Sequence, residues 1–91
     1  MDTSRYKVKI TNDAGLHTRS AVMTVKKAST FSSSIEFSAN GMRVNAKSIM
    51  GLLALGASKG TSMEIETRGS DQVEAMKEMV KLIRNGFEES H

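Results

Sequence analysis

The sequence predicts an α+β fold: an open-faced sandwich with three helices on one face of a four-stranded antiparallel sheet. Four short segments alternate apolar and polar residues, which is typical of strands with one buried face. Two further segments repeat apolar residues at three- and four-residue steps, and a third, short apolar segment has capping residues at both ends. The predicted order is β-α-β-β-α-β-α, and we expect residues 1–91 to form a single domain.

The first strand is predicted at residues 5–11 and the first helix from 18 to about 30. The strand places three apolar side chains on one face: Tyr6, Val8 and Ile10. The predicted buried side of the helix consists of Ala21, Val22, Val25 and Ala28. Phe31 is expected to pack beneath the end of this helix.

Residues 34–39 and 42–45 are predicted to pair as a hairpin, because Asn40-Gly41 between them favours a two-residue turn. The fourth strand is predicted at residues 61–68, where apolar and polar residues alternate again.

The last helix is expected to begin after Asp71, which has capping-box spacing to Glu74. Its apolar stripe is predicted to cover the sheet. The residues of that stripe are Val73, Met76, Val80, Ile83 and Phe87.

The composition excludes several function classes. Hydrophobic residues make up 38% and charged residues 25%, which is ordinary for a globular protein. Without cysteine there is no disulfide or thiol chemistry, and no metal-ligand cluster or nucleotide phosphate loop is visible. The net charge is +3, but four aromatic residues and no basic run do not favour nucleic-acid binding. No signal peptide or membrane span is predicted, so we expect a cytoplasmic protein with no membrane insertion.

The stretch 12–21 predicts a phosphate site at the start of the first helix. The first N–H groups of a helix lack partners inside it and attract anions, so the amides of Thr18 and Arg19 are candidate phosphate ligands. His17 is a candidate nucleophile through an unprotonated ring nitrogen, and Arg19 adds a cation suited to phosphate oxygens. Gly15 allows the turn. On the residues alone, a lone histidine near a helix start is more often a polar surface residue.

Ser48 and Gly56 are expected to cap the short helix at its two ends. One interpretation is that Ser48 is only a cap and that its apolar neighbours belong to the core. The other is that Ser48 is phosphorylated, since a helix N-terminus tolerates negative charge, and that some apolar side chains form an exposed docking patch. The neighbours concerned are Ile49, Met50 and Leu53.

Residues 15–21 (GLHTRSA) and 45–52 (NAKSIMGL) together resemble HPr, the histidine-containing phosphocarrier of the bacterial sugar phosphotransferase system. The first is similar to the active-site motif GLHARPA. The second is similar to the regulatory segment NAKSIMG in the form associated with Gram-positive bacteria. The resemblance covers nearly the whole chain.

The resemblance implies a carrier that has no turnover of its own and needs no cofactor or metal. His17 would accept phosphate from enzyme I, with phosphoenolpyruvate as the original donor, and pass it to sugar-specific enzyme IIA subunits, assisted by Arg19. Ser48 would be the target of HPr kinase/phosphorylase, and its phosphorylated form would signal to a catabolite control repressor. The docking face would include Ile49, Met50 and Leu53.

Three positions depart from the family pattern. Ser20 occupies the position of a proline in the helix start, which we expect to make the turn less rigid. Ala14 stands where a polar residue is frequent, and Thr18 replaces an alanine. An HPr-like regulatory paralogue that acts mainly through phosphorylated Ser48 therefore stays open as an alternative. An unrelated small α+β binding domain is a third hypothesis.

Overall fold

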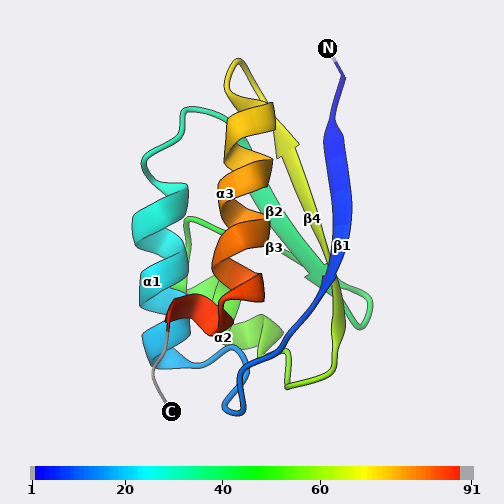
Figure 1. Cartoon of the computed structure of the whole chain (residues 1–91), viewed down its shortest axis with the longest axis vertical. Coiled ribbons are helices and arrows are strands. Elements are labelled where there is room, and N and C mark those ends of the chain that lie inside the picture. The colour runs from blue at the N-terminus through cyan, green and yellow to red at the C-terminus, as the bar shows by residue number, and fades with distance from the viewer. Residues whose placement is uncertain (1, 89–91) are drawn as a thin grey trace.

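The computed structural model describes residues 2–88 and has the predicted α+β architecture (Figure 1). No helix in this range is both long and apolar enough to cross a bilayer. The elements are β1 (Ser4–Lys9), α1 (Thr18–Ala28), β2 (Ser34–Ala39), β3 (Met42–Asn45), α2 (Ile49–Leu55), β4 (Ser62–Arg68), α3 (Gln72–Arg84) and a 3₁₀ helix, η1 (Gly86–Glu88).

The four strands form one sheet in the order β1-β4-β2-β3, and every neighbouring pair is antiparallel. The three α-helices lie on the same face of this sheet (Figure 1). The core fills the space between the two layers. Its fully buried side chains include Ile35, Phe37, Met63 and Ile65 from the sheet and Ala21, Leu52, Met79 and Ile83 from the helices. This two-layer arrangement confirms the predicted fold class.

The outer face of the sheet carries a ladder of ion pairs. Glu36 on β2 and Glu66 on β4 are register partners with like charge. Arg43 on β3 lies between them, with its Nη1 3.0 Å from Glu36 Oε1 and 3.3 Å from Glu66 Oε2. Arg5 Nε lies 3.0 Å from Glu66 Oε1, and this hydrogen bond lowers the pKa of Glu66. The polar half of each alternating strand therefore faces away from the helices.

The first half of the chain matches the predictions except on one helix face. β1 begins and ends one or two residues before the predicted strand, and α1 ends at Ala28. The buried positions of α1 are Ser20, Ala21, Thr24 and Ala28. Ser20 and Thr24 are thus buried on this helix, where the periodicity predicted Val22 and Val25. Both can be buried because each hydroxyl bonds a backbone carbonyl.

The predicted turn and caps of the central segment are confirmed. Asn40 and Gly41 both have positive φ, as a two-residue hairpin turn between β2 and β3 requires. Ser48 caps α2, since its Oγ accepts a hydrogen bond from the Gly51 amide at 3.0 Å. Gly56 ends α2 in the left-handed conformation, with φ of 50°. Local residue chemistry is therefore sufficient to fix this segment.

The predicted stripe of α3 is confirmed in part: Ile83 and Phe87 are fully buried and Met76 and Val80 pack against the core, but Val73 is exposed. The core face of α3 consists of Ala75, Met79, Leu82 and Ile83. Val73 is 70% exposed, and Met76 and Val80 are only partly buried. Two apolar rows with helical spacing run along this helix, and its position against β1, β4 and α1 buries the other row more deeply. Phe87 is buried but belongs to η1.

The predicted capping box at the start of α3 is wrong. Asp71 is the N-cap residue, but its carboxylate makes no bond to the first turn of the helix. Instead it accepts hydrogen bonds from the loop before β2. Oδ2 accepts from the Ser32 amide at 3.0 Å, and Oδ1 accepts from the Ser33 amide at 2.9 Å and from the Ser33 hydroxyl. These bonds lower the pKa of Asp71 to about 2.

Asp71→Asn is expected to lower stability at neutral pH and to lose this effect in acid. A carboxylate with a lowered pKa contributes stability above its ordinary pKa of 3.8 and loses it as the pH falls through about 2. The melting temperatures of the two proteins should therefore differ clearly at pH 7 and converge between pH 4 and pH 2. A difference that stays constant over this range contradicts the assignment.

Candidate functional site at the start of the first helix

The loop between β1 and α1 is a tight turn held at both ends. The Gly15 amide donates to the Asn12 carbonyl at 3.1 Å, and the buried Asn12 side chain donates through Nδ2 to the Gly15 carbonyl at 2.8 Å. The Leu16 amide then donates to the Ala57 carbonyl at 2.8 Å, which ties the loop to the chain that follows α2. His17 therefore begins α1 from a fixed backbone.

Gly15 is required at this turn for two reasons. Its φ is +65°, a backbone conformation that residues other than glycine rarely adopt. A Cβ atom there would lie 2.5 Å from the Ala57 carbonyl oxygen and 2.9 Å from the Ser58 Cα. The prediction that Gly15 makes the turn is confirmed. The structure adds the close approach to residues 57 and 58, which sequence spacing does not predict.

His17 is the N-cap residue of α1, as the sequence predicts. Its backbone is extended and its side chain is partly exposed. Thr18 and Arg19 follow as the first two helical residues, and both are exposed. The first turn of α1 contains no acidic residue. The positive end of the helix dipole and an exposed arginine thus occur in the same turn, which suits an anion.

Ser20 is fully buried in this first turn, where its hydroxyl contacts the loop. Its Oγ accepts from the His17 amide at 2.9 Å and lies 3.0 Å from the Gly15 carbonyl oxygen and 3.2 Å from that of His17. Besides the approach of residues 57 and 58, the contacts of Asn12 and Ser20 are the features of this site that the sequence did not predict. An asparagine just before a glycine turn was the available signal for Asn12, because its side chain often bonds a nearby backbone group. Ser20 gave no comparable signal.

The helix α2 lies at the same end of the molecule as the start of α1 (Figure 1). Its buried residues are Leu52 and Leu55. The other apolar side chains point outward: Ile49 is 38% exposed, Met50 79% and Leu53 39%. The interpretation that all the apolar residues of this helix are core is therefore wrong. The three exposed side chains form an apolar patch beside Ser48, which we call the α2 patch.

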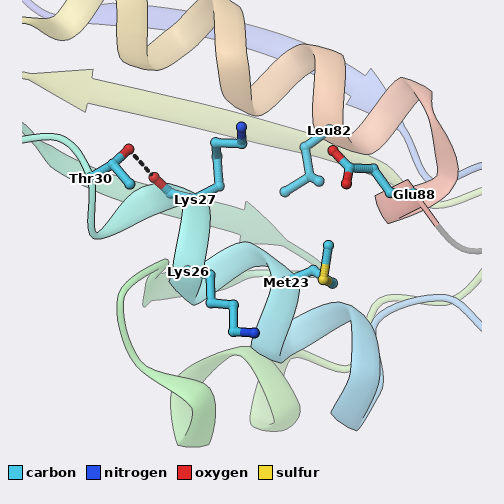
Figure 2. Close-up of a pocket in the computed structure, with 6 residues that line it drawn as sticks. All are labelled: Met23, Lys26, Lys27, Thr30, Leu82 and Glu88. Carbon is cyan, nitrogen blue, oxygen red and sulfur yellow. Dashed lines mark hydrogen bonds between the residues drawn. The ribbon is translucent and has the colours of Figure 1, made fainter.

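A separate hollow of about 230 Å³ lies between α1 and α3 (Figure 2). It is lined by Met23, Lys26, Lys27, Thr30, Leu82 and Glu88. None of these is a predicted site residue. Within residues 2–88, no group of three or more His, Asp or Glu side chains could hold a metal ion. His17 does not line the hollow, so the candidate site at the start of α1 lies on a different part of the surface.

The fold and the site define a small open-faced α+β domain that presents a histidine at a helix N-terminus. The family model described as the HPr component phosphorylation site of the phosphotransferase system matches residues 4–85. The chain belongs to the HPr family of phosphocarrier proteins. Members of this family are carriers and not catalysts, and they interact with the enzymes of the phosphotransferase system.

Individual relatives agree with this assignment. The phosphocarrier protein HPr of Neisseria meningitidis serogroup A is 45% identical over 82 residues, which cover 90% of this chain and 92% of that protein. HPr of Treponema pallidum is 43% identical, over 90% of this chain and 93% of that protein. The crystal structure of HPr from Thermoanaerobacter tengcongensis is 41% identical and covers 97% of this chain and 99% of its own, with a TM-score of 0.91. Because relatives include proteins of Gram-negative bacteria, the expected Gram-positive type is not confirmed.

Proposed function

We propose that this chain carries phosphoryl groups in the phosphoenolpyruvate-dependent sugar phosphotransferase system, accepting phosphate on His17 and passing it to sugar-specific subunits. The observation that supports this most is the position of His17 at the N-cap of α1. At an N-cap the first amides of a helix have no partner within the helix, and Arg19 follows two residues later. Membership of the phosphocarrier family supports the same chemistry.

The transfer needs only a nucleophile and a stabilised phosphate. The lone pair of an unprotonated His17 ring nitrogen attacks phosphorus, and the bond between phosphorus and the donor breaks with its electron pair leaving on the donor. The other ring nitrogen keeps its proton. The amides of Thr18 and Arg19 and the Arg19 guanidinium stabilise the phosphoryl oxygens as the group moves. Onward transfer is the same step with His17 as the leaving group.

We assign the α2 patch as the docking surface for enzyme I and for the enzyme IIA subunits. Ile49, Met50 and Leu53 expose apolar area on a helix that lies at the same end of the molecule as the start of α1. Exposed apolar patches rimmed by polar residues are typical of protein-binding sites. A partner seated on this helix would reach the start of α1 at the same time.

Ser48 is proposed as the regulatory phosphorylation site, with HPr kinase/phosphorylase as its kinase and a catabolite control repressor as the reader. It is partly exposed and directly precedes the α2 patch. A phosphate on its Oγ would remain at a helix N-terminus, where negative charge is tolerated. The modification would therefore change the docking surface without unfolding the domain.

Ser48→Asp is expected to slow phosphorylation of His17 by enzyme I about tenfold, because the added charge lies at the edge of the α2 patch and weakens docking. The rate should be measured at a protein concentration below KM. Ser48→Ala controls for the lost cap. Ser70→Asp controls for charge, because the β4–α3 turn lies at the opposite end of the molecule (Figure 1). Equal rates for Ser48→Asp and Ser70→Asp contradict the shared surface.

The carrier role is tested by onward transfer. The phosphorylated protein is purified, mixed with an enzyme IIA subunit, and followed by intact mass. Movement of the phosphate to the enzyme IIA subunit is the expected result. A phosphate that remains on this chain for every enzyme IIA subunit tested contradicts a carrier role.

A further inference from the structure

Ser20 links the first turn of α1 to the loop that carries His17. The side chain is 0% exposed and is the third residue of the helix. One hydroxyl has one proton and two lone pairs. Ser20 Oγ can therefore accept the His17 amide at 2.9 Å while it donates to the Gly15 carbonyl at 3.0 Å or to the His17 carbonyl at 3.2 Å.

These contacts hold the backbone on both sides of Leu16. The Gly15 carbonyl is bonded by Ser20 from the helix and by the Asn12 side chain from the end of the strand. The His17 amide is bonded by the same Ser20 hydroxyl. Because all these groups are buried or at the helix start, water competes poorly for them. The hydroxyl therefore fixes the position of the His17 backbone, from which the imidazole side chain extends.

The same hydroxyl also bonds one amide at the start of the helix and leaves the next two available. It satisfies the amide of His17. The amides of Thr18 and Arg19 occupy the next two positions, which have no partner within a helix and are available to an anion. One amide thus anchors the loop, and the next two remain for phosphate oxygens.

We propose that Ser20 is a positioning residue for phosphoryl transfer. Its hydroxyl holds the His17 backbone so that the ring and the amides of Thr18 and Arg19 meet the same phosphoryl group. Ser20 does not touch the phosphate itself. The inference rests on the proposed function of His17 and adds a residue whose hydroxyl the motif comparison does not predict to act.

The test measures kcat and KM for the protein as the substrate of enzyme I with phosphoenolpyruvate. Ser20→Ala removes the hydroxyl. Thr24→Val is the matched control, because Thr24 is also fully buried in α1, one turn further on, and its hydroxyl donates to a backbone carbonyl at 2.8 Å. Ser20→Cys keeps a side chain of similar shape with a weak hydrogen-bonding group, so it tests the hydroxyl without creating a cavity.

Ser20→Ala and Ser20→Cys are each expected to lower kcat about tenfold, since small displacements of a reacting group have effects of this size. KM should change less than about twofold, because the α2 patch is intact. Thr24→Val should lower the melting temperature but keep kcat. If both Ser20 variants have the same kcat as the wild type, this inference alone is overturned. It is also overturned if Thr24→Val lowers kcat as much as the Ser20 variants do. If wild type accepts no phosphate, the proposed function fails and the inference with it.

Discussion

Replacing His17 with alanine is expected to abolish phosphoryl acceptance and to leave the fold intact. The side chain is partly exposed at the N-cap of α1, outside the hydrophobic core. Loss of an N-cap side chain destabilises a protein by about 1 kcal/mol, which is a small part of the stability of a domain of this size. The expected protein is therefore folded and unreactive. Circular dichroism and the melting temperature report the fold, and intact mass after incubation with enzyme I and phosphoenolpyruvate reports acceptance.

Thr18→Ala is the matched control for this experiment. Thr18 is exposed next to His17, and its backbone amide, which alanine retains, is the group assigned to phosphate. This variant should accept phosphate. Two outcomes for His17→Ala contradict the account: acid-labile phosphate on a folded variant, which would mean another acceptor, or an unfolded variant, which would make His17 a structural residue.

Gly15→Ala is expected to destabilise the domain by about 3 kcal/mol and to displace the loop that carries His17. Positive φ alone disfavours alanine by roughly 1–2 kcal/mol. The new Cβ would also lie 2.5 Å from the backbone carbonyl oxygen of Ala57, and a backbone atom cannot move aside as a flexible side chain can. The free energy of unfolding in urea measures the loss.

Gly60→Ala separates the two contributions. Gly60 has φ of +91°, but no heavy atom lies within 4 Å of its Cβ position. Alanine there meets the conformational penalty without the clash, so its loss should be roughly 1–2 kcal/mol. Equal losses at both positions would show that the contact between the loop and residue 57 is not tight. In addition, Gly15→Ala should slow His17 phosphorylation, whereas Gly60→Ala should not.

The parts of the fold that could be predicted from sequence are those fixed by local chemistry. Asn40-Gly41 defined the hairpin, and Ser48 and Gly56 defined both ends of α2, because each acts within a few residues of its own position. His17 was placed at the helix start for the same reason. Alternation along the strands was enough to assign one buried face to the sheet.

The parts that failed depend on contacts between distant segments. Asp71 was expected to cap its own helix, but it bonds Ser32 and Ser33, about forty residues earlier in the chain. Val73 was expected in the core because periodicity does not distinguish between two apolar rows of one helix. Ser20 is an exception, because its hydroxyl contacts backbone groups only three to five residues away, those of His17 and Gly15. The sequence pattern at this position indicated only the absence of a proline.

The most direct test of the account is intact mass and acid lability of the wild-type protein after incubation with enzyme I and phosphoenolpyruvate. We expect the gain of one phosphate that is lost in mild acid and that maps to His17. No gain would contradict the carrier assignment. If acid-stable phosphate then appeared on Ser48 with HPr kinase and ATP, the chain would act as a regulatory paralogue instead.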